Sequence, residues 1–363
     1  MKLAVTQENL AKALSIVGRV AQNKAQLPVL NNILLRAENN RLLLAATNLE
    51  IAITEYIGAK VIQDGVITIP ARLLGDYISN LPKGTITLEL EKHKLHIMTD
   101  NYQSTMNGIA ADEFPALPEI HDPQTLHIPT KDIKSAISQT ILTASHDETR
   151  PILTGVYLHS HEGYLYCAAT DGYRLSQKRL IATTEVISAV VPTQTLQDVL
   201  RVIPDDCDEV VVLLDAQQIR FLIGDIEITS RLIDGTFPDY RQLIPKKTEI
   251  SFATKKDELL RISKIASLFA RESGGSITIK TDSTKGNVSI HSLASQLGEN
   301  TSEIITKPSG DGSVTLNSRY LIEALGVIDS NELTFGFSGK LAPCVMTPND
   351  TPDYTHIIMP LKS

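Results

Sequence analysis

The stretch LLAATNLEIAI at residues 43–53 returns later in the chain as YCAATDGYRLS at residues 166–176. In both stretches an Ala-Ala-Thr tripeptide ends an apolar run, and the two tripeptides lie 123 residues apart. Two further phrase pairs keep this spacing: LPVLNNILL at 27–35 with RPILTGVYL at 150–158, and EFPALP at 113–118 with TFPDYR at 236–241. Repetition at about a third of a 363-residue chain indicates duplicated domains.

A third copy is fainter. GSVTLNSRYLIEAL at 312–325 resembles the stretch at 188–200, and PDYTHIIMP at 352–360 resembles PDYRQLIP at 238–245. Each third is also doubled internally, because a short amphipathic helix followed by three or four strands recurs about six times. The predicted fold class is α+β, with three homologous domains over residues 1–122, 123–247 and 248–363.

Six candidate helices follow from apolar residues at helical spacing, as Leu10, Leu14 and Val17 illustrate. Thr6, Thr130 and Thr254 stand near the starts of three of them and are expected to cap the helix ends. The candidate helices are residues 7–20, 71–80, 130–142, 193–203, 255–271 and 317–328.

The overall composition is that of a globular protein, with 42% hydrophobic and 21% charged residues. The chain has no apolar run near the roughly 20 residues of a membrane span. Its first residues, MKLAVTQENL, lack a signal peptide's apolar stretch, and its three cysteines are widely separated. We therefore expect a cytoplasmic protein without disulfides, membrane contact or a thiolate metal site.

The charge distribution bears on nucleic-acid binding. A net charge of −8 argues against a protein that grips nucleic acid by bulk electrostatics. The absence of Trp and an aromatic content of 5% argue against a binder of stacked single strands. However, the candidate helices have net charges of +1, 0, +1, 0, +3 and 0, which leaves −13 for the rest. Helices that line one concave surface would make that surface positive, and it could then face phosphates without reading bases.

Four longer phrases resemble the bacterial sliding-clamp family, the β subunits of DNA polymerase III. They are ATDGYRLS at 169–176, GDIEITSRLIDGTFPDYRQLIP at 224–245, DEFPALP at 112–118 and IIMPLKS at 357–363. The resemblance extends over essentially the whole chain, including its three-part repeat. It implies a non-catalytic processivity factor without a cofactor, in which each chain forms half of a homodimeric ring around duplex DNA.

The resemblance also implies a pocket between the second and third domains that takes short linear peptides from polymerases and clamp-loader subunits. Apolar side chains there would hold a partner's Leu or Phe, while Thr170 and Arg174 could bond the peptide's polar groups. The matching positions are Leu153, Thr170, Gly172, Tyr173, Arg174, Leu175, Pro238, Leu243, Asn317, Tyr320, Leu341, Pro343, Ile357, Ile358, Met359, Pro360 and Leu361. The chain departs from the family pattern at Gln242, where Arg is frequent, and at Ser273, near the place of an aromatic residue in some members.

Two further sets of residues come from the same resemblance. The residues expected to face DNA are Lys24, Arg72, His146 and Arg150. Thr193 and Gln194 occupy a place that is basic in some members, so a contact there is not expected. At the dimer interface, the edge YQSTMNG at 102–108 is expected to meet the helix with Leu268 and Phe269, with Met106 as the apolar partner.

Other interpretations of the sequence remain open at this point. An enzyme could use His146, Asp147 and Glu148 or Asp171, although consecutive residues do not converge on one substrate atom. The spacings of His93 with His96 and of His159 with His161 are interpreted as surface histidines rather than metal ligands, because no carboxylate or cysteine set lies nearby in sequence. A third possibility is a scaffold that binds peptides and never encircles DNA.

Overall fold

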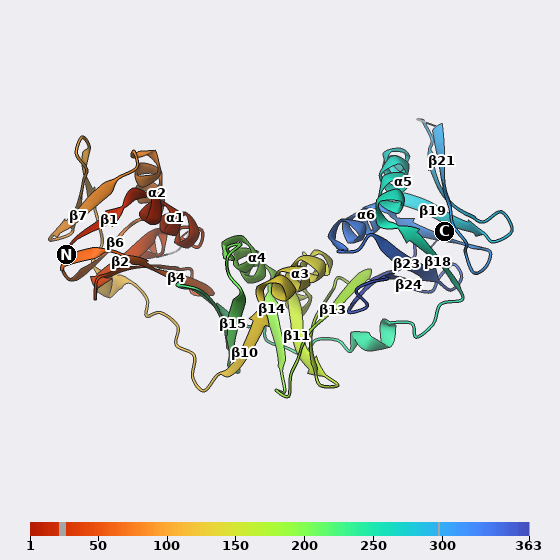
Figure 1. Cartoon of the computed structure of the whole chain (residues 1–363), viewed down its shortest axis with the longest axis horizontal. Helices are drawn as coiled ribbons and strands as arrows, with labels where there is room; N and C mark the ends of the chain where they lie inside the picture. The colour runs from red at the N-terminus through yellow and green to blue at the C-terminus, as the bar shows by residue number, and fades with distance from the viewer. Residues whose placement is uncertain (22–26, 297, 363) are drawn as a thin grey trace. The chain divides into compact units, whose positions relative to one another are not determined.

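The computed structural model describes residues 1–21, 27–296 and 298–362. These residues form two compact units (Figure 1). Unit 1 contains residues 1–130 and 201–232, and unit 2 contains residues 131–200 and 233–363. The central repeat is thus divided between the units, because its strands complete a sheet in each of them. The three domain ranges predicted from the repeat remain a prediction.

Unit 1 contains two antiparallel sheets. The five-stranded sheet has the order β5 (Lys60–Gln63), β1 (Lys2–Thr6), β7 (Thr85–Glu91), β8 (Lys94–Met98) and β9 (Gln103–Asn107). The eight-stranded sheet has the order β10 (Gln124–Pro129), β15 (Glu209–Leu214), β16 (Gln218–Ile223), β17 (Ile226–Arg231), β4 (Ile51–Gly58), β3 (Arg41–Thr47), β2 (Asn32–Glu38) and β6 (Gly65–Pro70). Strands of the first and central repeats meet in this sheet at the β17–β4 pair.

Unit 2 repeats this construction. Its eight-stranded sheet has the order β14 (Ser188–Pro192), β11 (Gly155–His161), β12 (Tyr164–Thr170), β13 (Arg174–Ala182), β25 (Tyr354–Ile358), β24 (Cys344–Pro348), β23 (Glu332–Phe337) and β18 (Ile250–Lys255). Its four-stranded sheet has the order β21 (Gly298–Ile305), β20 (Asn287–Ala294), β19 (Ser276–Asp282) and β22 (Gly312–Asn317). Here the central and C-terminal repeats meet at the β13–β25 pair.

The two eight-stranded sheets explain the 123-residue repeat. Strands β2 and β3 map onto β11 and β12 residue for residue at that shift. The cross-strand register is also kept, since Leu34 pairs with Ala45 as Tyr157 pairs with Ala168. A one-residue slip would turn the buried face of a strand toward solvent, so the register and the sequence spacing are preserved together.

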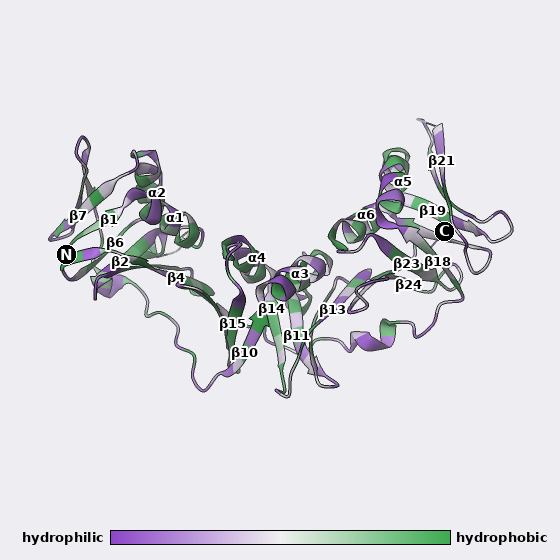
Figure 2. Ribbon diagram, viewed as in Figure 1, coloured by the Kyte–Doolittle hydropathy of each residue, from purple (hydrophilic) through white to green (hydrophobic). Residues whose placement is uncertain are grey.

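The described residues contain six α-helices, as the sequence predicts, with slightly different bounds. Their buried residues recur on one face, and in the first helix these include Leu10, Leu14 and Val17. Figure 2 shows both hydrophobic and hydrophilic residues along α5, which packs against α6 in unit 2. The helices are α1 (Gln7–Val17), α2 (Ala71–Asn80), α3 (Thr130–Thr140), α4 (Thr193–Val202), α5 (Lys256–Phe269) and α6 (Ser318–Val327).

Each of the six described helices begins directly after a strand, and in α1, α3 and α5 the first N–H is held by distant backbone rather than by a threonine side chain. The bonds run from the N–H groups of Gln7, Thr130 and Lys256 to the carbonyls of Gly84, Asp208 and Asn331, at 2.8, 2.9 and 2.9 Å. The predictions of threonine side-chain caps are therefore wrong, although Thr6 does stand at the N-cap position of α1. Thr6 makes no side-chain cap bond to any described residue, Thr130 is already helical, and Thr254 precedes the cap position. Because the chain passes from strand to helix without a loop, the first N–H of each of these helices faces the residue that precedes the neighbouring strand.

The observed bounds also reduce the positive charge of the helices. Arg19 lies beyond α1, Lys255 ends β18, and Arg271 lies in a short 3₁₀ helix. The six helices then contain nine Lys or Arg and seven Asp or Glu, a net charge of +2. The asymmetry persists in sign but is weaker than the candidate ranges indicated. Among the described residues, none of the helices is long and apolar enough to cross a membrane.

Candidate functional site

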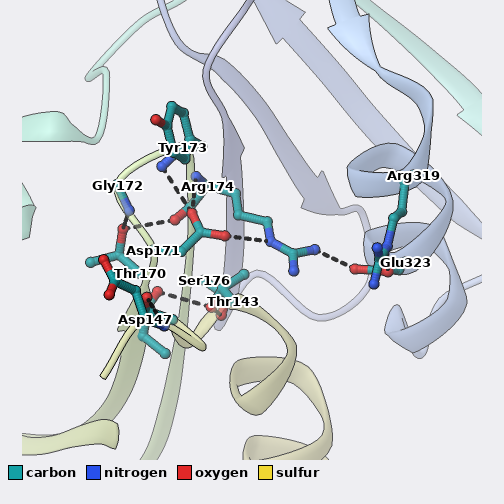
Figure 3. Close-up of polar contacts among 12 residues, drawn as sticks. Thr143, Asp147, Thr170, Asp171, Gly172, Tyr173, Arg174, Ser176, Arg319 and Glu323 are labelled. Carbon is teal, nitrogen blue, oxygen red and sulfur yellow. Dashed lines mark hydrogen bonds and ion pairs between the residues drawn. The ribbon is translucent and has the colours of Figure 1, made fainter. Parts of the chain in front are cut away.

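The turn between β12 and β13 is held by its own side chains (Figure 3). Asp171 Oδ1 accepts hydrogen bonds from the N–H groups of Tyr173 and Arg174, both at 2.9 Å. The Thr170 hydroxyl donates to the Arg174 carbonyl at 2.7 Å and accepts from the Gly172 N–H at 3.1 Å. Gly172 has a φ of 91°, a conformation that only glycine adopts without strain. The Thr-Asp-Gly sequence therefore builds a well-defined turn.

Arg174 connects this turn to α6. Its side chain is only 7% exposed, and its guanidinium lies between two carboxylates. Nε donates to Asp171 Oδ2 at 3.0 Å, and Nη1 donates to Glu323 Oε2 at 2.5 Å (Figure 3). The guanidinium also lies over the ring of Tyr320, 4.4 Å from its centroid. A buried charge is tolerated when it is paired and hydrogen-bonded, so Arg174 is fixed in this position. Its Nε and Nη1 donors are already used, which leaves less capacity for a peptide than the sequence suggested.

Glu323 is a second acidic partner of Arg174, which the sequence alone did not reveal. Partial burial raises the pKa of its carboxyl, but hydrogen bonds from Arg319 and Arg174 outweigh this and lower the pKa below its usual value. Arg319 Nε donates to Glu323 Oε1 at 2.6 Å, and the Arg319 N–H donates to Asn317 Oδ1 at 2.9 Å. The four-residue spacing of Arg319 and Glu323 was a visible signal for a helical pair. Its third member, Arg174, is 149 residues away in sequence.

Three of the predicted peptide residues form a row across neighbouring strands. Ile358, the last residue of β25, pairs with the first residues of both β13 and β24. Because both pairs are antiparallel, the next residue, Met359, lies between Tyr173 and Pro343. The Met359 N–H donates to the Tyr173 carbonyl at 2.8 Å. Residues from the central and C-terminal repeats thus come together at this sheet end.

The seventeen residues predicted to bind a peptide fall into a buried group and a more exposed group. Leu153, Leu175 and Ile357 belong to one buried cluster with Phe237 and Tyr240, and Ile358 is fully buried in the C-terminal core. Thr170 and Arg174 are buried as well. The exposed and half-buried members are Gly172, Tyr173, Pro238, Leu243, Asn317, Tyr320, Leu341, Pro343, Met359, Pro360 and Leu361. We call this second group the candidate peptide surface, because these side chains can touch a ligand without rearrangement. Tyr173, Leu243 and Leu341 are 64%, 51% and 67% exposed.

A buried polar pair connects β11 to the FPDY segment. His159 is 5% exposed, and its Nε2 lies 2.8 Å from the Tyr240 hydroxyl, which donates to Gln177 Oε1 at 2.8 Å. Burial lowers the pKa of His159 to about 4. Its interpretation as a surface histidine is therefore wrong, because β11 turns this side chain toward the FPDY segment. Alternation along β11 did not predict this burial. His159 and its neighbour Leu158 point to opposite faces of the strand, and both faces are covered here.

The predicted DNA-facing residues belong to different parts of the chain. Lys24 lies outside the described residues. Arg72, with Arg19 and Asp76, lines an open groove of ≈ 740 Å³ formed by α1 and α2. Its side chain is 78% exposed, and Nε lies 3.8 Å from Asp76 Oδ2. This ion pair is too long and too exposed to hold the guanidinium firmly, so Arg72 remains able to meet a phosphate.

His146 and Arg150 lie in an exposed loop of unit 2. Arg150 Nε is 3.5 Å from Asp147 Oδ2, and a Cβ built on Gly172 would lie 3.9 Å from Arg150 Nη1. Arg150 is therefore beside the turn of the candidate peptide surface. Hydrogen bonds from the side chain and backbone of Thr149 lower the pKa of Asp147. An ionised, exposed Asp147 is a poor proton donor, which weakens the enzyme interpretation of this loop.

The dimer prediction needs one correction. Met106 is only 4% exposed and packs in the core of its own sheet, so it is not an apolar side chain on the exposed edge. Strand alternation explains this, because Thr105 and Asn107 on either side of Met106 are exposed. Strand β9 is nevertheless the edge strand of its sheet. On α5, Leu268 is 52% exposed and Phe269 is half-buried.

No group of three or more His, Cys, Asp or Glu that could hold a metal ion occurs within residues 1–21, 27–296 and 298–362.

Comparisons with known proteins identify relatives over the full length of the chain. Family models of the DNA polymerase III beta subunit match in succession: the N-terminal domain over residues 1–118, the central domain over 127–239 and the C-terminal domain over 241–362. The beta sliding clamp of Synechococcus elongatus is 32% identical over 375 residues, covering 100% of this chain and 99% of that protein.

Solved structures agree with this. The DNA polymerase sliding clamp of Bacillus subtilis matches with a TM-score of 0.96 at 25% identity, covering 100% of this chain and 99% of that one. The sliding clamp of Pseudomonas aeruginosa bound to griselimycin matches with a TM-score of 0.95 at 26% identity, and both chains are covered completely.

Proposed function

Because this chain belongs to the bacterial β sliding-clamp family, the β subunit of DNA polymerase III, we propose that it encircles duplex DNA as a homodimer and binds partners through the candidate peptide surface. Family membership makes it a non-catalytic processivity factor of DNA replication, built from three clamp domains. The alternative of an enzyme that uses His146, Asp147 and Glu148 is therefore set aside. Residues 1–122, 123–247 and 248–363 are the proposed domains, and the cytoplasm is the proposed location.

The observation that supports the peptide site is the row of Tyr173, Met359 and Pro343 at a sheet end, next to the Arg174–Glu323 bridge. A cluster of exposed large apolar side chains on a soluble protein indicates an interaction site. Tyr173 is 64% exposed, and the turn that contains it is held by Asp171. A rigid apolar surface loses little entropy when a short peptide binds, which favours recognition of a linear segment.

The griselimycin complex of the Pseudomonas aeruginosa clamp is one example of a ligand held by a clamp of this family. We propose that this chain also binds griselimycin, at the candidate peptide surface. Occupancy by such a ligand and by a partner peptide would then be mutually exclusive.

Substitution of exposed residues tests the peptide site most cleanly. Leu175 is only 2% exposed, so truncating it would open a cavity and destabilise the fold. The double variant Met359→Ala with Leu341→Ala removes contact area instead. We expect a fluorescent peptide from the cognate polymerase to bind roughly tenfold or more weakly to it, measured by anisotropy. Leu73→Ala is the matched control, because Leu73 is an exposed leucine of unit 1, outside both this surface and the proposed dimer seam. Equal affinity for wild type and the double variant would remove the assignment.

A ring that holds DNA by enclosure, not by grip, has a distinctive behaviour. Loaded on nicked circular DNA by an ATP-driven loader, the protein should remain bound until the DNA is linearised and should then slide off the ends. Retention on linear DNA with free ends would contradict enclosure.

The edge of β9 and the exposed side of α5 are the proposed seam between copies, with Leu268 and Phe269 as its apolar part. Leu268→Glu should therefore shift the mass in light scattering from dimer toward monomer, whereas a wild type that is monomeric at micromolar concentration would favour the scaffold.

A further inference from the structure

Unit 1 contains a cavity at the end of strands β3, β4 and β17, next to the loop with Ala116 and Pro118. Its volume is ≈ 330 Å³, and Leu49 stands at its edge with half of its side chain exposed. We call it the Leu49 pocket. Its lining residues all belong to unit 1, whereas the candidate peptide surface belongs to unit 2. The two sites therefore share no residue.

The Leu49 pocket occupies the place of the candidate peptide surface in the repeat. At the 123-residue shift, Thr47, Glu50 and Ile51 correspond to Thr170, Tyr173 and Arg174. The strand beside them corresponds too, because Ile51 pairs with Ser230 just as Arg174 pairs with Ile358. The same backbone bond closes both sheet ends: Arg231 N–H to the Glu50 carbonyl at 3.0 Å, and Met359 N–H to the Tyr173 carbonyl at 2.8 Å.

The turn at the edge of the pocket is also preserved. The Thr47 hydroxyl donates to the Ile51 carbonyl at 3.0 Å and accepts from the Leu49 N–H at 3.0 Å. Asn48 Oδ1 accepts from the N–H groups of Glu50 and Ile51 at 3.0 and 2.8 Å. These are the bonds that Thr170 and Asp171 make in unit 2.

One difference in the turn is informative. Leu49 has a φ of 78° where the second turn has Gly172. A left-handed conformation is strained for leucine, and half of the Leu49 side chain gains no packing in return. A strained, half-exposed leucine is explained if its side chain contacts a ligand.

The chemistry of the pocket differs from that of the candidate peptide surface. Thr229, Ser230 and Arg231 stand where the second site has Ile357, Ile358 and Met359. Glu50 stands where the second site has Tyr173. Glu50 and Arg231 are exposed, and neither forms an ion pair with a residue in the part of the chain that the structure describes. The pocket therefore offers one acidic group, one basic group and an apolar part made by Leu49, Ala116 and Pro118.

We propose that the Leu49 pocket is a second, separate peptide site, which takes a short segment with an apolar residue between a basic and an acidic one. The basic side chain pairs with Glu50, the acidic one with Arg231, and the apolar one packs on Leu49. The volume is at the low end for ligand cavities, so the segment is short. The inference rests on the proposed function only through the repeat, which relates this pocket to the candidate peptide surface.

A pentapeptide probe tests this on the full-length protein. The probe is N-acetylated, C-amidated Lys-Ala-Leu-Ala-Asp, titrated to millimolar concentration while the labelled methyl groups of Leu, Ile and Met are followed by NMR. Shifts should appear at Leu49 and Ile51 and be absent at Met359. The uncharged peptide Gln-Ala-Leu-Ala-Asn should bind roughly tenfold more weakly, because two exposed ion pairs are lost. No shift at Leu49, or shifts at Met359 alone, would overturn the proposal.

Two variants separate binding from folding. In Leu49→Gly the backbone strain disappears, so the melting temperature should stay equal or rise while probe affinity falls several-fold. Glu50→Gln with Arg231→Gln should reduce the affinity for the charged probe to that for the uncharged one. If either variant bound the probe like wild type, the pocket assignment would be wrong. The double variant Met359→Ala with Leu341→Ala should leave probe binding unchanged, so a failure of the proposed peptide surface and a failure of this pocket give different results.

Discussion

Replacing Arg174 by Met removes the cation that connects the β12–β13 turn to α6 while keeping most of the side-chain volume. Loss of one partner from a buried ion pair costs ~3–5 kcal/mol when the remaining charge stays buried. Here the remaining charges are partly relieved. The Glu323 side chain is 31% exposed and keeps its contact with Arg319, and Asp171 keeps two backbone donors. We therefore expect a loss of about 2 kcal/mol, which lowers the melting temperature of unit 2 by ~4–8 °C.

Scanning calorimetry of the full-length protein measures this loss. Arg319→Met is the control, because Arg319 pairs with the same carboxylate but is 77% exposed. It should change the stability by no more than ~0.5 kcal/mol. A double-mutant cycle with Glu323→Gln isolates the Arg174–Glu323 interaction. If Arg174→Met melts like wild type, or if the cycle shows no coupling, the bridge does not hold the turn to α6.

The same bridge has a pH signature. The folded-state pKa of Glu323 is lowered below 4.5, so its contribution to stability is present above that pH. It is lost as the pH falls through the folded value, because the carboxylate must then be protonated. Wild type should lose this increment in acid, and Arg174→Met should lose a smaller one. Parallel acid melting curves for the two proteins would contradict this.

Four further predictions rest on single residues. Burial raises the pKa of the Glu55 carboxyl from 4.5 to about 7 in the folded protein. The folded protein therefore holds this proton more tightly than the unfolded chain, and its stability falls as the pH rises from 4.5 to about 7. Glu55→Gln should melt at a higher temperature than wild type at pH ~8 and at the same temperature at pH ~5. Burial lowers the pKa of His159 from 6.5 to about 4, so the free energy of unfolding falls by up to ~1.4 kcal/mol for each pH unit below 6.5. His159→Phe should reduce the slope of the unfolding free energy against pH in this range. Gly172→Ala should cost ~1–2 kcal/mol in urea unfolding, because alanine is strained at a φ of 91°. Arg72→Glu should slow loading onto DNA in a loader assay and leave the affinity for polymerase peptides unchanged.

Much of the fold could be predicted from local features of the sequence. The 123-residue spacing marks β2 and β11 as equivalent strands, since hairpins of equal length keep the same register. The helices follow from the 3.6-residue periodicity of buried positions such as Leu10 and Leu14. The resemblance of the DGYRL and FPDY stretches to sliding clamps indicated the family that the full-length comparisons then established.

Contacts between distant segments could not be predicted in this way. The side chain of Met106 faces its own core because of the strand's alternation, which an uncertain edge register did not reveal. His159 is buried because Tyr240 covers it, 81 residues further along the chain. The helix starts are held by backbone carbonyls of distant loops, which no side-chain capping pattern encodes.

The amino-acid sequence by itself determined the repeat, the helices and strands and the family, because these depend on periodicity and on residues close together in the chain. Only the tertiary structure decided which of the predicted residues are exposed and which acid meets Arg174. It also decided that Arg231 lies beside Glu50 at one sheet end, as Met359 lies beside Tyr173 at the other. The physical reason is that burial and ion pairing depend on which strand or helix lies beside a residue, and those neighbours come from other repeats.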